Sequence, residues 1–245
     1  MITVWTNIRR ARTGGFTLVE LLVVMAMLGL VFSMLGPALA KARDKAHELQ
    51  CLNNLRNLSV AQALYRGDYG GHLVPHAVYR PPESRSLVPN AHFTMWPDLL
   101  RPYTGDERTF RCPCMRCDAD RGIGYGMNLT VAGQFSVPHE KAAVHESEIR
   151  NPGLTILFGD AAFVTRKSML KPAVEWVEDP ARPLGSWTMR TPGDAMWHWA
   201  PTRVMPRHGG RANVSFVDGH VEPLTIPQLG FDKPVGHPLN WWDRY

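Results

Sequence analysis

The sequence predicts an α+β fold in which one long N-terminal helix packs on a small antiparallel sheet with long loops. Three observations carry this prediction. A long apolar segment near the N-terminus continues into an amphipathic one, strand-like segments gather in the second half, and the chain of 245 residues contains 20 Pro and 21 Gly. With 44% apolar residues, the chain can also form a sizeable core.

Residues 16–40 form the apolar half of the predicted helix and contain one charged residue, Glu20. At about 1.5 Å per residue they are long enough to cross a bilayer core of roughly 30 Å. Three arginines precede them, so we expect a cytoplasmic N-terminus and a periplasmic body, with a single pass through the inner membrane. A secretory signal peptide is the alternative, but this segment is longer than usual, lacks an A-x-A site at its end and contains a carboxylate.

The basic charge of the chain does not indicate a nucleic-acid partner. The formal charge of +5 includes three arginines within the first fifteen residues, which contain no acid. The remaining 24 basic and 22 acidic residues give only +2. We therefore expect no nucleic acid among the partners.

The polar segment after residue 40 keeps a helical period. Apolar residues recur in steps of three or four at Leu52, Leu55, Leu58, Ala61 and Tyr65. The helix therefore continues over residues 41–70 with one face against the body, and three glycines, at 67, 70 and 71, end it. Gly29, Gly36 and Pro37 predict a kink or a loosened turn in the apolar half.

Strand signals occur at residues 155–158, 174–177, 186–189, 213–217 and 220–224, whereas residues 72–150 appear irregular. Asp218 and Gly219 stand between the last two segments and predict a two-residue hairpin turn.

The segment Gly14-Gly15-Phe16-Thr17-Leu18-Val19-Glu20-Leu21-Leu22 resembles the processing site of type IV prepilins and type II secretion pseudopilins. The resemblance implies that a prepilin peptidase cuts between Gly15 and Phe16, that the amine of Phe16 is methylated and that the apolar helix is retained. It also implies that the stretch around Gly29, Gly36 and Pro37 melts on assembly, with a static kink as the alternative.

Cleavage would create a cationic partner for the Glu20 carboxylate. The new amine of Phe16 is a cation at the membrane edge, and a carboxylate one turn deeper can pair with it in a neighbouring subunit. Such a pair would fix the axial stagger of the subunits. A pair within one chain is the alternative.

Four further segments resemble the subset of prepilin-type proteins that carries a C-terminal H-x9-DG sequence. They are residues 51–55, 112–113, 125–128 and 159–160, and His208, Asp218 and Gly219 supply the H-x9-DG sequence itself. The expected organisation is a cleaved leader (1–15), a transmembrane assembly helix (16–40), its amphipathic continuation (41–70) and an extracytoplasmic pilin-like domain (71–245).

His208, Asp218 and His220 are the candidates for chemistry, as a catalytic dyad or a metal site. The structural interpretation is favoured, because a hairpin alone explains Asp218-Gly219 and His208 can hydrogen-bond across its base. Neither a Gly-x-Ser-x-Gly sequence nor a phosphate-binding loop is present in the sequence. We therefore expect no enzymatic activity.

The four cysteines, Cys51, Cys112, Cys114 and Cys117, are expected outside the cytoplasm, where disulfides persist. The first interpretation is a Cys51–Cys112 bridge, with Cys114 and Cys117 paired locally or free. Zinc binding with a nearby His comes second and redox catalysis third, and connectivity stays open.

No cofactor is expected, and calcium and zinc are the ions to consider. Related secretion pseudopilins bind calcium in a C-terminal loop, but Asp160, Asp194 and Asp218 are not clustered in the sequence as six to eight oxygen ligands would require.

The resemblance implies a structural filament subunit whose partners are other pseudopilins or pilins, the prepilin peptidase and an inner-membrane assembly platform. A secretion pseudopilin is preferred over an adhesive or DNA-uptake pilin on resemblance alone. The alternative is a membrane-anchored, extracytoplasmic metal-binding or hydrolytic module. It would use His208, Asp218, His220 and the cysteine cluster from Cys112 to Cys117.

Overall fold

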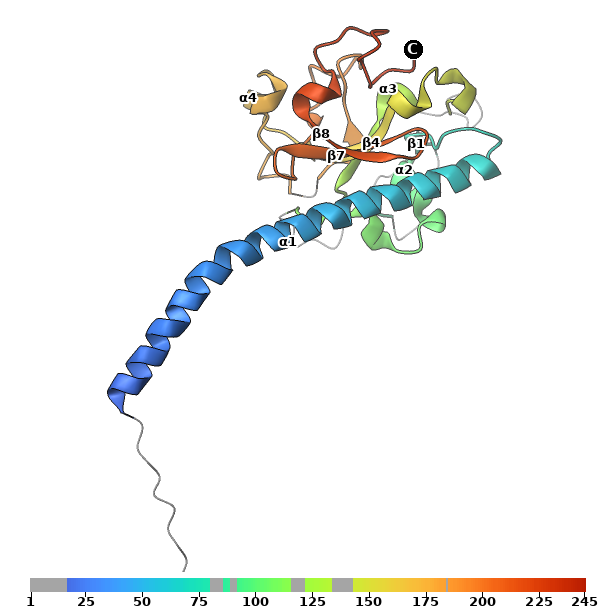
Figure 1. Ribbon diagram of the computed structural model, residues 1–245. Coiled ribbons are helices and arrows are strands. Elements are labelled where there is room, and N and C mark those ends of the chain that lie inside the picture. The colour runs from blue at the N-terminus through green and yellow to red at the C-terminus, as the bar shows by residue number, and fades with distance from the viewer. Residues whose placement is uncertain (1–16, 80–85, 89–91, 116–121, 134–142, 184) are drawn as a thin grey trace, which may run out of the picture. The chain divides into compact units, whose positions relative to one another are not determined.

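A computed structural model of the chain describes residues 17–79, 86–88, 92–115, 122–133, 143–183 and 185–245 (Figure 1). The chain divides into two compact units, Met1–Arg43 and Asp44–Tyr245. Helix α1, Leu18–Asp68, is the first element and contributes residues to both units.

The beginning of α1 is fixed by a reciprocal pair of hydrogen bonds between Thr17 and Glu20. The Glu20 amide donates to Thr17 Oγ1 at 3.3 Å, and the Thr17 amide donates to Glu20 Oε2 at 2.9 Å. This capping box satisfies two amides that have no partner inside the helix. At the other end, Gly70 and Gly71 have φ angles of +59° and +88°, so the predicted glycine stop is confirmed.

Every described residue of the first unit, 17–43, is exposed. Within the described chain, α1 is the one helix long and apolar enough to cross a membrane. The helix runs through Gly29, Gly36 and Pro37 without interruption. A continuous helix can still bend at a proline, so the kink or loosened turn at these residues, and its melting on assembly, stay predictions.

The part of α1 in the second unit buries one face. Leu55, Leu58, Ala61 and Tyr65 are buried as predicted, and Leu52 is half-buried. These side chains belong to a hydrophobic core that also contains tryptophan and phenylalanine side chains from the body (Trp96, Phe110, Phe158).

A six-stranded mixed sheet forms the centre of the body. Its strands are β3 (Tyr125–Asn128), β4 (Ile156–Phe163), β5 (Thr188–Met189), β6 (Thr202–Val204), β7 (Arg211–Phe216) and β8 (Val221–Thr225). The order is β5-β3-β4-β7-β8, and β6 also pairs with β4. All pairs are antiparallel except β3 with β5, so the expected antiparallel sheet carries one parallel edge.

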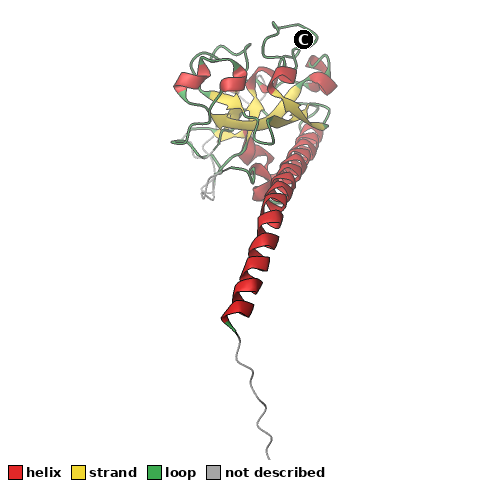
Figure 2. Ribbon diagram, turned by 60° about the vertical axis from the view of Figure 1, so that its left-hand side comes forward, coloured by secondary structure: helices red, strands yellow, loops and turns green. Residues whose placement is uncertain are grey.

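Smaller elements surround the sheet. They are the strand pair β1 (Ala77–Val78) and β2 (Thr94–Met95), the short helices α2 (Trp96–Leu100), α3 (Leu129–Ala132) and α4 (Arg166–Met169), and several 3-10 turns. Figures 1 and 2 show the second half of α1 along one face of the sheet, with α3 and α4 on the other.

The strand predictions had mixed outcomes. Strands β4, β7 and β8 occur within a few residues of their expected places, and residues 186–189 contain the two-residue β5. The strand expected at 174–177 is wrong, because a 3-10 turn, Ala173–Glu175, follows Pro172 there. Strands β3 and β6 were not predicted.

The predicted hairpin between β7 and β8 is present, but its turn differs from the predicted two-residue turn. Gly219 donates its amide to Phe216 O at 3.0 Å, and Phe216 donates to His220 O at 3.0 Å. Gly219 has a φ of +100°, whereas no described residue other than glycine has a positive φ. The turn is thus longer than two residues, and only Gly219, not Asp218, needs the left-handed conformation.

Candidate functional sites

The first candidate site is the start of α1. Gly15 and Phe16 lie outside the described residues. Glu20 is exposed and accepts hydrogen bonds from the amide and hydroxyl of Thr17, at 2.9 and 2.7 Å. Both bonds go to Oε2, and a carboxylate accepts several donors. Neither of these bonds uses Oε1.

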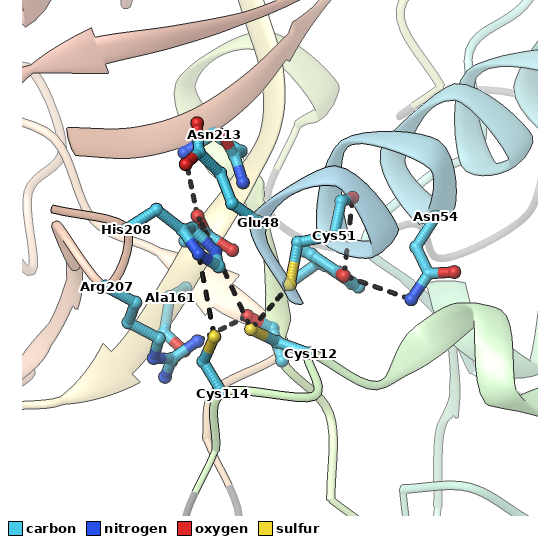
Figure 3. Close-up of polar contacts among 12 residues, drawn as sticks. Glu48, Cys51, Asn54, Cys112, Cys114, Ala161, Arg207, His208 and Asn213 are labelled. Carbon is cyan, nitrogen blue, oxygen red and sulfur yellow. Dashed lines mark hydrogen bonds and ion pairs between the residues drawn. The ribbon is translucent and has the colours of Figure 1, made fainter. Parts of the chain in front are cut away.

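The second candidate site is a buried group that we call the Cys–His–Asp cluster: Cys51, Cys112, Asp160 and His208. Their potential ligand atoms all lie within 4.8 Å of one another. Figure 3 shows Cys51, Cys112 and His208 converging from α1, the loop that contains Cys112 and the turn before β7. Asp160 comes from β4. Within the described part of the chain, no other group of three or more such side chains meets this criterion.

Local structure around each residue positions the side chains of the cluster. Cys51 lies on the buried face of α1, with 0% exposure. Cys112 follows a 3-10 turn, and Gly124 lies so close that a Cβ there would come within 2.5 Å of the Cys112 amide nitrogen. Asp160 lies in the central strand β4, where its Oδ2 accepts a 2.7 Å hydrogen bond from the Asn213 amide.

His208 is placed by a tight turn. Its amide donates to Arg211 O at 3.0 Å, and the Arg211 amide donates back to His208 O at 3.1 Å. The two intervening glycines have φ angles of +59° and +80°, which side chains other than glycine rarely adopt. The sequence His-Gly-Gly-Arg therefore directs the imidazole into the cluster.

Four contacts connect the cluster. Cys51 Sγ lies 2.8 Å from Cys112 Sγ, and Cys112 Sγ lies 3.8 Å from His208 Nε2. The same Nε2 lies 3.3 Å from Asp160 Oδ2. On the other side of the ring, Nδ1 lies 3.6 Å from Cys114 Sγ.

The groups of the cluster differ in the direction of their pKa shifts. The hydrogen bond to Cys112 and burial raise the pKa of Cys51. Hydrogen bonds from Cys114 and Cys51 lower the pKa of Cys112. Burial alone would lower the pKa of His208, but its contacts with Asp160 and Cys112 outweigh burial and raise the pKa to about 10. Burial raises the pKa of Asp160, and the hydrogen bond to His208 opposes that shift.

Arg207 adds a buried cation beside the cluster. Its guanidinium donates to Gly124 O at 2.9 Å, Ala161 O at 2.8 Å and Glu178 Oε1 at 3.0 Å. Burial opposes its charge, but Glu178 and the cluster anions hold the pKa of Arg207 above its usual value. The surroundings therefore favour a thiolate at Cys112, whereas burial disfavours the charged form of Asp160.

The expected Cys51–Cys112 pair is thus brought into contact, but both thiols are free in this structure. The disulfide stays a prediction. Cys114 is also free, and Cys117 lies outside the described residues.

The structure does not assemble His208 with Asp218 and His220. Asp218 Oδ1 lies 2.7 Å from His220 Nδ1 in the exposed β7–β8 turn, and the His220 ring stacks on Phe216. The carboxylate that contacts His208 is Asp160 instead. The three carboxylates considered for calcium also have separate partners, because Asp194 pairs with Arg190 at 2.8 Å.

Most of the segments that carried the resemblance to the H-x9-DG subset meet at this cluster, whereas Asp218 and Gly219 lie in the β7–β8 turn. Besides the four cluster residues, Asn54 of α1 donates to Arg111 O at 2.8 Å and to the Tyr125 hydroxyl at 3.2 Å. These bonds connect α1, the loop that contains Cys112 and β3.

Comparison with known proteins adds one finding. Residues 10–36 match the family described as the prokaryotic N-terminal methylation motif. No curated protein and no solved structure matches the chain. The motif implies processing by a prepilin peptidase and pilin-like assembly, and together with the long apolar helix it fits membrane anchoring.

Proposed function

We propose that the chain is a pseudopilin, a structural subunit of a type II secretion filament or a related type IV pilus-like filament. One observation carries the proposal. The N-terminal methylation motif at residues 10–36 opens a helix whose residues 18–43 are all exposed.

The exposed helix requires an environment that the chain itself does not supply. Apolar side chains such as Leu18 (78% exposed), Phe32 (69%) and Met34 (71%) find no cover within the described residues. Burying a side chain of this size stabilises by about 1.5–3 kcal/mol. A bilayer supplies that environment before assembly, and helices of neighbouring subunits supply it within a filament.

The sequence of events follows from the motif. The prepilin peptidase removes residues 1–15, the amine of Phe16 is methylated, and the helix keeps the subunit in the inner membrane with its body in the periplasm. An inner-membrane assembly platform then adds subunits to a filament of pseudopilins. The subunit performs no turnover.

Glu20 is the residue that sets the register in this proposal. Its Oε2 is held by Thr17, and Oε1 faces no partner among the described residues. A methylated Phe16 amine of the adjacent subunit would neutralise this carboxylate. Pairing offsets the cost of removing both charges from water.

Filament assembly in cells that supply the peptidase and the platform tests the proposal. Glu20→Ala should abolish filaments while leader cleavage and membrane insertion continue, because neither step requires a partner subunit. The expected cost is about 3–5 kcal/mol per dry intersubunit contact, since the amine remains buried alone. Glu20→Gln should also assemble poorly, because the amide keeps the shape without the charge.

Asp44→Ala is the matched control. It removes an exposed carboxylate from the same helix but outside the apolar segment, so filaments should form normally. Normal filaments from Glu20→Ala, with processed Phe16 confirmed by mass, would refute the assigned role of Glu20.

A further inference from the structure

We propose that the Cys–His–Asp cluster binds one zinc ion inside the body of the subunit. The ligands are Cys51 Sγ, Cys112 Sγ, His208 Nε2 and a carboxylate oxygen of Asp160. All four side chains are at most 4% exposed.

The donor set fits zinc in kind and number. Structural zinc sites are tetrahedral, closed to solvent and made from thiolate, imidazole and carboxylate ligands. Two sulfurs also disfavour calcium and magnesium, which prefer oxygen.

The distances are close to those of a tetrahedral site. Zinc bonds of about 2.0–2.3 Å place two ligand atoms about 3.3–3.8 Å apart. The His208 Nε2 to Asp160 Oδ2 distance is 3.3 Å, and the Cys112 Sγ to His208 Nε2 distance is 3.8 Å. The Cys51 and Cys112 sulfurs, 2.8 Å apart, must separate by about 1 Å on binding, and every pair of ligand atoms already lies within 4.8 Å.

The surroundings of the ligands match those of metal-bound side chains. A zinc-bound histidine usually hydrogen-bonds through its second ring nitrogen, and His208 Nδ1 faces Cys114 Sγ at 3.6 Å. Asp160 Oδ2 is oriented by the Asn213 amide at 2.7 Å. Asp160 Oδ1 is buried without a hydrogen-bond partner, and an oxygen in that position needs a ligand.

The loaded site carries one net negative charge. Two thiolates and one carboxylate carry three negative charges, and zinc supplies two positive ones. The buried guanidinium of Arg207 interacts electrostatically with Cys112 and Asp160, and it also pairs with Glu178 at 3.0 Å. Its position beside the cluster lowers the cost of a buried negative charge.

A cavity lies beside the cluster. Cys114, which contacts His208, lines this cavity of about 400 Å³ together with Glu178, Asp179 and two prolines, Pro180 and Pro183. Both carboxylates in its wall pair with arginines, Glu178 with Arg207 and Asp179 with Arg182. A bound ion would connect α1 with the centre of the sheet and so add binding energy to the fold.

A Cys51–Cys112 disulfide is the competing state, because it consumes the same sulfurs. It would leave Asp160 Oδ1 without a partner and would not use the imidazole as a ligand. The two states exclude each other, so one preparation distinguishes them.

The test uses the full-length chain extracted from membranes in mild detergent, without chelator or reductant. Elemental analysis should find one zinc per chain, and denaturation should release the metal together with free Cys51 and Cys112 thiols. After a chelator has removed the zinc, added Co²⁺ should occupy the empty site and give thiolate-to-cobalt charge-transfer and tetrahedral d–d bands. A zinc-free chain with a Cys51–Cys112 disulfide, or free thiols that take up neither Zn²⁺ nor Co²⁺, would overturn the proposal.

Variants locate the ion. His208→Ala and Asp160→Asn should lose the stoichiometric zinc, whereas His220→Ala and Asp218→Asn, which alter the exposed pair, should retain it. Equal zinc in His208→Ala and the unaltered chain would place the metal elsewhere and overturn the assignment.

A third kind of variant, Cys114→Ala, leaves all four ligands in place and changes only a neighbour of His208. Its result therefore does not depend on removing a ligand, which could also cause misfolding. It should keep one zinc per chain but lower the affinity about 10–100-fold in competition with a chelator, since the partner of His208 Nδ1 is removed. An unchanged affinity would contradict Nε2 as the ligand atom.

Discussion

The two parts of α1 share one helical geometry but have opposite surroundings. Residues 18–43 are exposed on all sides, whereas residues 51–65 bury one face in the core of the body. In the first part, no described residue covers the apolar side chains, so a bilayer or another subunit is needed to bury them. In the second, a stripe such as Leu55 and Leu58 is covered by the chain's own fold. The difference assigns assembly to the first part and stability of the body to the second.

The apolar part of α1 and the body also differ in the surroundings of a carboxylate. Glu20 is exposed, and its hydrogen bonds reach only Thr17 in its own first turn. Asp160, by contrast, is fully buried and contacts His208 and the Asn213 amide. An exposed acid in an apolar segment indicates a partner outside the chain, whereas a buried acid must be satisfied inside it.

A pair of leucine substitutions should give the largest difference between the two parts. Leu58 is 0% exposed, and Leu58→Ala should lower the free energy of unfolding of the body by about 2–5 kcal/mol, because a cavity replaces the side chain. Leu30 is 61% exposed, and Leu30→Ala should leave it unchanged.

Urea unfolding in detergent, followed by tryptophan fluorescence, measures this difference, since every tryptophan except Trp5 lies in the body. Equal losses in the two variants would show that the first part of α1 also stabilises the body.

A pair of glycine substitutions should give a smaller difference within the body unit. Gly219→Ala should cost about 1–2 kcal/mol, because its φ of +100° strains any side chain although the nearest atom to a new Cβ is 3.9 Å away. Gly67→Ala in α1 meets no atom within 4 Å and should instead stabilise by up to about 1 kcal/mol.

The same unfolding assay compares the two glycine variants. A Gly219→Ala body as stable as the unaltered one would mean that the β7–β8 turn relaxes without strain.

The features that the sequence predicted well have local causes. The apolar segment, the buried stripe of α1 and the glycine stop each depend on residues a few positions apart. Strands β7 and β8 were predictable for the same reason, because alternating side chains flank Asp218-Gly219. Local signals suffice where an element meets a single environment.

Strand β3 escaped prediction because it is only four residues long and its signal is weak. All four residues, Tyr125–Asn128, are buried, so no alternation marks the strand. It also contains Gly126, where a Cβ would come within 2.6 Å of Ala161 Cβ. Close packing demands that glycine, although glycine weakens a strand signal.

The Cys–His–Asp cluster was predicted only in part, because its members are far apart in sequence. The Cys51–Cys112 pair was expected, whereas the joining of His208 and Asp160 to it was not. Cys51 and Cys112 are separated by 61 positions, and Cys112 and His208 by 96. Asp218, ten residues after His208, was the nearer carboxylate in sequence, yet Asp160 is the one in contact. Only sheet pairing between β4 and β7 brings Asp160 beside the Asn213 amide and the His208 turn.

The intact mass of the chain recovered from membranes tests the account most directly, because every step of assembly depends on the processed end of α1. We expect a mass that lacks residues 1–15 and carries one added methyl group, with sequencing that begins at Phe16. A chain that retains Met1, or one cut near Ala40, would contradict the account, since the exposed part of α1 would then be blocked by its leader or lost.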